Sequence, residues 1–292
     1  DTLAAVRDFL STVWRGSAET RRACVQAEDL QGVASILQKF GPNGIEVSDP
    51  GIQVIVTDTA LLTVRLSLWL QQTTTNASPE DKAAVAVTSL ATVAVSSLCG
   101  VVAGGLATPN SAATNERPLL DALFAVIDDE AVDSAAPAIA ALSQGITQCI
   151  TTLAVRNGGA ADAETCVAML DAMTTRLQST HSVSKAKFLW KSALSLVVAC
   201  FQKQVESFCL SPSSIKALAD AYAHVAHTFA SGAVNPSASL RQLLQFLMQQ
   251  SSANASDHQA AASSTLRGIC AAAGPVFVGT LLSPSAATAE RV

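Results

Sequence analysis

The sequence predicts a mainly α-helical protein, an antiparallel multi-helix bundle or array with one short β-hairpin near residues 44–56. Apolar residues recur three and four positions apart along most of the 292-residue chain, which is the period of a helix with one buried face. Hydrophobic residues make up 49% of the chain and charged residues only 14%, against about 25% in typical proteins. Such weakly charged stripes are expected to bury themselves against one another.

Helices are expected over the segments in which this period persists. The segment 18–40 contains a break near Glu28, and the segment 187–209 is apolar nearly all round, which is typical of a central helix. Two further helices open at Pro212 and Pro236, since proline is favoured in a first helical turn, and Gly274-Pro275 breaks or kinks the last one. The other expected helices cover residues 2–14, 80–103, 118–127, 133–156, 161–179 and 257–273.

One segment departs from the helical period. Residues 44–47 and 52–56 alternate apolar and polar positions around Ser48-Asp49-Pro50-Gly51. Proline followed by glycine suits the centre of a type II turn, so a hairpin is expected here. It divides the chain into a short helical piece with the hairpin, residues 1–65, and a helical bundle domain, residues 66–292.

The segment 83–109 contains no charged residue and is long enough to cross a bilayer. It is rich in Ala, Ser, Thr and Gly and lacks flanking basic and aromatic anchors, so a central buried helix is the favoured interpretation. Any association with a membrane is then expected only through a parent protein.

No motif of an enzyme or a nucleotide site occurs in the sequence, so neither catalysis, a cofactor nor a small-molecule substrate is expected. His224 and His227 are three residues apart, as metal ligands on a helix can be, but no carboxylate lies within a turn of them, and no metal site is expected. The net charge of −5 provides no basic surface for nucleic acid. Trp14, Trp69 and Trp190 are interpreted as core anchors. The partners expected are other protein chains.

Cysteines and glycosylation sequons bear on the compartment. Seven cysteines are present, none in a C-x-x-C pair, so either free buried thiols or one to three disulfides are compatible with the sequence. Asn76-Ala77-Ser78 and Asn254-Ala255-Ser256 are N-glycosylation acceptors in polar stretches between helices. The sequons and the low charge favour an extracellular or cell-surface location.

Residues 116–179 carry a family resemblance. Segments 117–123, 138–143 and 163–173 follow in the order of a short helix, an Ala-Ala-x-Ala-Leu helix and a third helix built around leucines and methionines. This order resembles the receptor-for-egg-jelly and GAIN-like helical region of polycystin-family proteins, and the hairpin at 44–56 is similar to the β portion of such modules. The resemblance implies a structural or interaction module of an extracellular or ciliary glycoprotein, and a disulfide between Cys149 and Cys166.

Two alternatives remain open at this point. The antiparallel helices suit equally a cytosolic α-solenoid of the HEAT or armadillo kind, such as a scaffold or nuclear-transport receptor fragment that binds other proteins. No fixed period near 40 residues is found, which counts against that interpretation. An Ala-rich cytoskeletal bundle of the talin kind is the third.

Overall fold

The computed structural model of the chain describes residues 2–41, 44–45, 47, 49–74, 82–107, 113–134, 136–155, 160–205, 207–229, 234–252 and 257–282. Over these residues the protein is helical and has no β-strand, which confirms the mainly α fold class. The chain divides into two compact units, residues 1–152 and residues 153–292. The boundary expected after residue 65 falls inside a helix.

Unit 1 contains six long or medium helices and several short ones. In chain order they are α1 (Thr2–Arg15), α2 (Ala18–Cys24), α3 (Ala27–Leu37), the 3-10 turn η1 (Gln38–Phe40), α4 (Pro50–Thr74), α5 (Lys82–Ala107), α6 (Ala113–Ile127), the 3-10 turn η2 (Glu130–Ser134) and the greater part of α7 (Ala136–Val155). The break expected near Glu28 is the short connection between α2 and α3.

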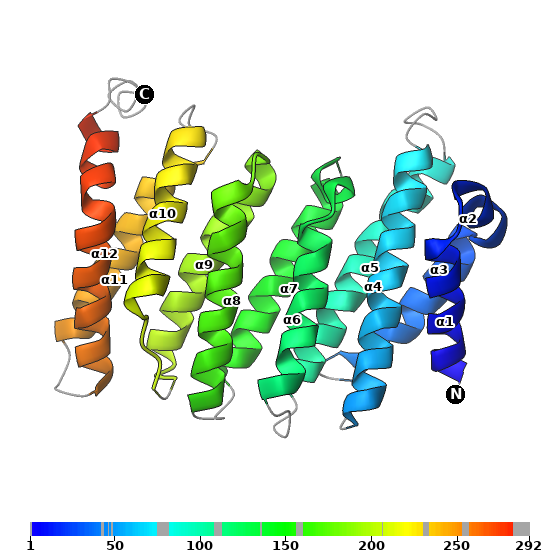
Figure 1. Cartoon of the computed structure of the whole chain (residues 1–292), viewed down its shortest axis with the longest axis horizontal. Coiled ribbons are helices and arrows are strands. Elements are labelled where there is room, and N and C mark those ends of the chain that lie inside the picture. Colours follow the sequence, from blue (N-terminus) through cyan, green and yellow to red (C-terminus); the bar gives the residue numbers. More distant parts are fainter. Residues whose placement is uncertain are drawn as a thin grey trace. The chain divides into compact units, whose positions relative to one another are not determined.

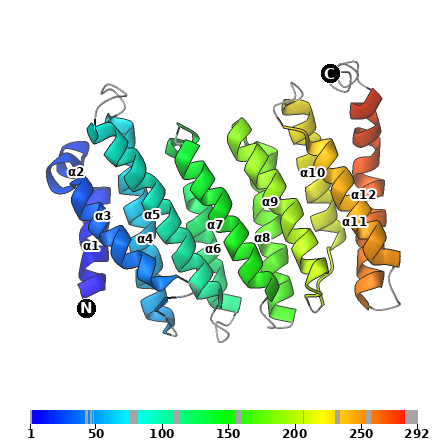
Figure 2. The same ribbon diagram turned by 180° about the vertical axis from the view of Figure 1, so that it is seen from behind.

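The helices of unit 1 pack in two layers. Helix α4 lies between α1 and α6 in one layer (Figure 1), and α3 lies beside α5 in the other (Figure 2). The long helices α4 and α5 pack against each other and join the layers. Helices α3 and α4 each contact both the following helix and the next helix but one, as in a stack of helical hairpins.

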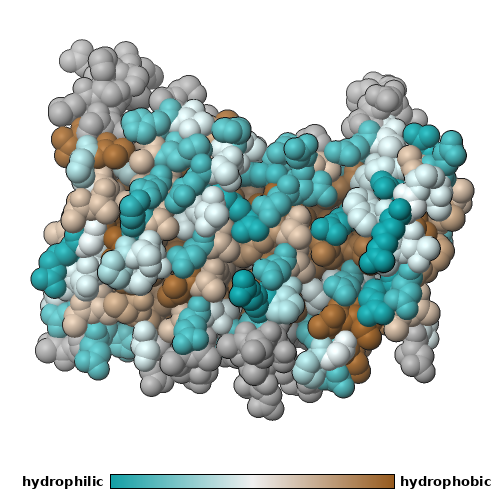
Figure 3. Space-filling view, in the orientation of Figure 1, coloured by the Kyte–Doolittle hydropathy of each residue, from teal (hydrophilic) through white to brown (hydrophobic). Residues whose placement is uncertain are grey.

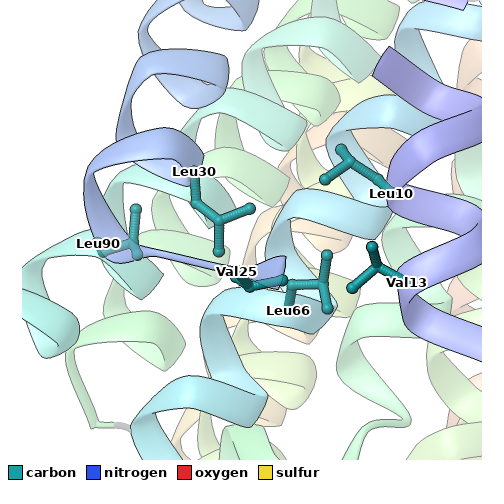
Figure 4. Packing of buried hydrophobic residues seen from close by; sticks show 6 residues of the cluster. All are labelled: Leu10, Val13, Val25, Leu30, Leu66 and Leu90. Carbon is teal, nitrogen blue, oxygen red and sulfur yellow. The ribbon is translucent and has the colours of Figure 1, made fainter. Parts of the chain in front are cut away.

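The packing of unit 1 uses the apolar stripes that the sequence shows. A core cluster brings together Leu10 and Val13 of α1, Leu30 of α3, Leu66 of α4, and two further residues (Figure 4). These two are Val25, in the connection after α2, and Leu90 of α5. One cluster thus joins α1, α3, α4 and α5, and the burial of these apolar side chains stabilises their packing.

The expected hairpin at residues 44–56 is wrong, because α4 begins at Pro50. The side-chain Oδ1 of Asp49 accepts hydrogen bonds from the backbone N–H groups of Gly51 (2.7 Å) and Ile52 (3.1 Å). Asp49 is therefore a helix cap, and Pro50 occupies the first turn, where its missing N–H costs nothing. Val56 is fully buried while Ile52 and Val54 are exposed, so the alternation of apolar residues does not mark a strand face.

Glycines allow α5 to approach its neighbours closely. A Cβ added at Gly104 would lie 2.6 Å from the carbonyl oxygen of Phe40, and one at Gly105 would lie 2.7 Å from Cδ1 of Leu119. The residues of η1 therefore rest directly on the backbone of α5. The expected apolar helix over residues 80–103 exists as α5, and most of its described side chains are buried within the unit.

Unit 2 repeats the two-layer pattern. It contains α8 (Ala160–Ser179), α9 (Val183–Gln202), α10 (Pro212–Thr228), α11 (Pro236–Ser252) and α12 (Asp257–Leu282). Helix α10 lies between α8 and α12 in one layer, and α9 lies beside α11 in the other (Figures 1 and 2). The helix starts expected at Pro212 and Pro236 are confirmed, whereas α12 continues through Gly274-Pro275 to Leu282 instead of ending there.

Aromatic side chains fill the centre of unit 2. Trp190 of α9 packs against Tyr222 of α10, with ring centroids 6.0 Å apart, and Phe277 of α12 lies 6.3 Å from Tyr222. Trp190 is 2% exposed, as expected of a core anchor, whereas the exposed residues Lys187, Lys191 and Ser195 form one stripe along α9. Polar and apolar residues alternate on the surface: Figure 3 shows hydrophilic residues interspersed with small, separated apolar patches on one face.

Candidate functional site

A groove that could bind a partner lies on unit 2. Its volume is about 390 Å³, and it is bounded by one face of α8 and by the segment that follows α9. The lining residues are Ala163, Glu164, Val167, Ala168 and Asp171 of α8, together with Ser207 and Cys209. The α8 residues are spaced so that they form one stripe along the helix. The short side chains of the two alanines leave open space above this stripe.

A tightly folded segment forms the opposite wall of the groove. Gln204 and Ser207 adopt positive φ angles of 53° and 58°, which are uncommon for residues other than glycine. The buried side chains of Val205 and Phe208 hold this segment in place, and the Phe208 ring meets Phe201 of α9 edge-on, with centroids 5.3 Å apart. Packing therefore fixes a strained backbone conformation that presents Ser207 and Cys209 to the groove.

The groove combines an apolar floor with negative charge. Glu164 is exposed, and Oδ1 of Asp171 is buried without a hydrogen-bond partner. These carboxylates are seven residues apart on α8, hence separated by roughly 10 Å along the helix axis. No histidine, lysine or arginine is among the described lining residues, so the two carboxylates give the groove a negative charge.

Unit 1 contains a stack of cationic and aromatic side chains. The guanidinium of Arg21 lies 4.8 Å from the ring centroid of Trp14 and 5.6 Å from that of Trp69, and Arg65 lies 5.9 Å from Trp14. Cation–π attraction thus links α2 to α1 and α4. Trp14 and Trp69 are partly buried rather than fully enclosed, so they anchor the edge of the core. Sequence spacing alone did not reveal this stack.

The histidines have a structural explanation. Nε2 of His224 lies 3.1 Å from the carbonyl oxygen of Thr180, just after α8, while His227 is exposed. The ring of His181 lies 6.4 Å from that of His224. In the part of the chain that the structure describes, no three His, Cys, Asp or Glu residues converge as metal ligands would.

Replacing both His224 and His227 with alanine is expected to leave partner binding unchanged and to lower stability by about 1 kcal/mol, the value of one hydrogen bond. Isothermal titration with zinc, before and after the substitution, checks this expectation. Stoichiometric zinc binding by the original chain that disappears in the variant would contradict it.

The cysteines are all free thiols in the structure. Cys24, Cys209 and Cys270 are exposed, whereas Cys99, Cys149, Cys166 and Cys200 are buried. The disulfide between Cys149 and Cys166 implied by the family resemblance stays a prediction. The expected glycosylation sites, Asn76 and Asn254, lie outside the described residues.

No family model matches the chain, and neither the curated proteins nor the solved structures contain a significant match.

The length and hydropathy of the helices bear on a possible membrane association. Among the residues that the structure describes, four helices are long and apolar enough to cross a membrane, namely α4, α7 and the stretches Ser89–Ala107 of α5 and Asp257–Val278 of α12. In the α5 stretch 67% of the residues are buried by other parts of the protein.

Proposed function

We propose that this chain is a non-catalytic scaffold of stacked helical hairpins that binds a segment of another protein in the groove of unit 2. The observation that carries the proposal is the packing of helices against the next but one within each unit, namely α3 with α5, α4 with α6, α8 with α10, α9 with α11 and α10 with α12. Stacks of this kind are typical of α-solenoids, which bind partners on the surfaces that their repeats present. This is the second of the interpretations that the sequence left open.

The chemistry of the groove favours a particular kind of segment. Its floor of Ala163, Val167 and Ala168 suits a small apolar side chain. The carboxylates of Glu164 and Asp171 are among the groove residues, and an arginine or lysine of the partner would pair with them. Complementary charge gives specificity and speeds association. The proposed partner segment is therefore short, extended and basic.

The extracellular location rests on different features. It is supported by the sequons at Asn76 and Asn254 and by the resemblance over residues 116–179. The element similar to a β portion is the start of α4, so that part of the resemblance no longer contributes. A glycan on Asn254 in the native protein, found by mass spectrometry, would support a module of a cell-surface glycoprotein. Unmodified Asn254 would favour a cytosolic scaffold.

The groove proposal is tested with peptides selected from a displayed random library against the whole chain. The selected peptides are expected to be rich in arginine or lysine. Ala168, which is exposed in the groove, is replaced by arginine, so that a bulky cation fills the site. Titration calorimetry should show a dissociation constant at least about tenfold higher, corresponding to about 1.4 kcal/mol.

The matched control is Gln245→Arg, which adds the same side chain at an exposed position of α11. It changes the net charge equally and should leave the dissociation constant within about twofold of the original. Equal weakening by both variants would mean that net charge, rather than the groove, determines binding. Selection of acidic or uncharged peptides would contradict the proposed partner chemistry.

A further inference from the structure

The four buried cysteines occur as two neighbouring pairs, one within each unit. Cys99 of α5 lies near Cys149 of α7, and Cys166 of α8 lies near Cys200 of α9. The cysteines of each pair are far apart in the sequence and come from different helices. Nothing in the sequence indicated this arrangement.

The Cys99 side chain rests directly on α7. A Cβ added at Gly145 would overlap both Cβ and Sγ of Cys99 and would lie 3.6 Å from its Cα. The backbones of α5 and α7 are therefore in contact at this point. Cys149 follows Gly145 by four residues, which is one helical turn on the same face. The two thiols are close enough that a negative charge on Cys99 raises the pKa of Cys149, in addition to the larger effect of its complete burial.

The second pair lies in unit 2. A side-chain hydrogen bond joins the thiols of Cys166 and Cys200, and both side chains are fully buried between α8 and α9. These helices are consecutive and pack against each other. Both pairs thus bring two sulfur atoms together across a helix–helix contact inside one unit.

We propose that Cys99–Cys149 and Cys166–Cys200 are the two disulfide sites of this chain, each joining two helices of one unit when the protein folds under oxidising conditions. This pairing replaces the Cys149–Cys166 bond that the family resemblance implies. It leaves the exposed Cys24, Cys209 and Cys270 as the three thiols outside the pairs.

The oxidant is a small-molecule disulfide such as oxidised glutathione. The thiolate of one cysteine attacks a sulfur of that disulfide, and one glutathione thiolate leaves. The second cysteine, as a thiolate, then attacks the mixed disulfide and releases the other glutathione. Formation of each protein disulfide thus removes two protons and two electrons from the pair of cysteine thiols. These electrons and protons reduce one glutathione disulfide to two thiols.

The reaction belongs to folding rather than to the folded state. Burial raises the pKa of Cys99 to about 12, and it raises the pKa of Cys149 well above its usual value. The hydrogen bond from Cys166 and burial likewise raise the pKa of Cys200. At pH 8 these three thiols stay protonated, and all four side chains are buried, so a chain that folds reduced is expected to stay reduced at both pairs.

The test maps disulfides after the denatured, reduced full chain is refolded with and without a mixture of reduced and oxidised glutathione. Free thiols are alkylated under denaturing conditions, and the monomer is digested with trypsin and glutamyl endopeptidase. These enzymes cut after Lys, Arg and Glu, although trypsin spares the Arg117–Pro118 bond. The four cysteines then fall in the separate peptides 83–116, 131–156, 165–176 and 192–203.

Peptide 83–116 is expected to be linked to 131–156, and 165–176 to 192–203. A link between 131–156 and 165–176, four alkylated thiols in the oxidised preparation, or failure to recover an oxidised monomer would each overturn the proposal. Oxidation should raise the melting temperature by roughly 5–15 °C, because each disulfide closes a loop and so lowers the conformational entropy of the unfolded chain. The double variant Cys99→Ala with Cys166→Ala should lose that increase, and an increase that persists would contradict the assigned pairs.

Discussion

Replacing Gly104 with alanine is expected to lower the free energy of unfolding by about 2 kcal/mol, even though alanine favours a helix. The added methyl group would lie 2.6 Å from the carbonyl oxygen of Phe40 and 3.2 Å from the carbonyl carbon of Gly41. These are backbone atoms, so no side-chain rotation can relieve the overlap, and η1 must move away from α5. Urea unfolding followed by circular dichroism measures the change.

The matched control is Gly32→Ala in α3. Gly32 is exposed, and a Cβ added there would meet nothing within 4 Å. The same methyl group should then stabilise the protein by about 0.5–1 kcal/mol, because alanine has a higher helix propensity than glycine. A stabilising effect at both positions would mean that α5 and η1 are not in contact as described.

Replacing Trp190 with alanine is expected to cost about 3–5 kcal/mol, the usual cost of deleting a large buried aromatic side chain. Trp190 is 2% exposed and packs against Tyr222, whose hydroxyl and the Ser237 hydroxyl are hydrogen-bonded at 2.9 Å. A cavity at this position removes contacts between α9 and α10. The loss should appear as a lower midpoint of urea unfolding and as loss of near-ultraviolet dichroism.

The substitution Trp190→Phe separates the contribution of ring packing to stability from that of the indole N–H. The indole Nε1 of Trp190 is buried and has no hydrogen-bond partner, so its removal eliminates an unsatisfied donor. Trp190→Phe should therefore cost about 1–2 kcal/mol, clearly less than alanine. An equal cost for the two variants would show that the indole N–H matters more than the ring, contrary to the packing described.

Helix starts were predictable because their signals are local. The hydroxyl of Ser211 accepts a hydrogen bond from the backbone N–H of Ser214 (3.1 Å), and Oδ1 of Asn235 accepts one from Ala238 (3.0 Å). In both places a capping side chain precedes a proline in the first turn, which is a pattern readable within four residues. The same chemistry at Asp49-Pro50 was mistaken for a turn, because the β-branched residues after it alternate in hydropathy.

The groove and the cysteine pairs could not be predicted, because both depend on residues distant in sequence. Ala168 and Cys209 border one groove only through the fold of the segment after α9, and no local pattern marks either residue. The family resemblance implied a disulfide between Cys149 and Cys166. In the structure it neighbours Cys99, because the contact of α5 with Gly145 of α7 brings them together.

Helical hairpins stack within each unit, so that each helix depends mainly on its immediate neighbours. Amide hydrogen exchange of the Gly104→Ala variant, followed by mass spectrometry, tests this dependence most directly. Exchange should accelerate in peptides from α3, α4 and α5, which pack together, and stay unchanged in peptides from α10, α11 and α12 of the other unit. Equal acceleration in all peptides would contradict this dependence.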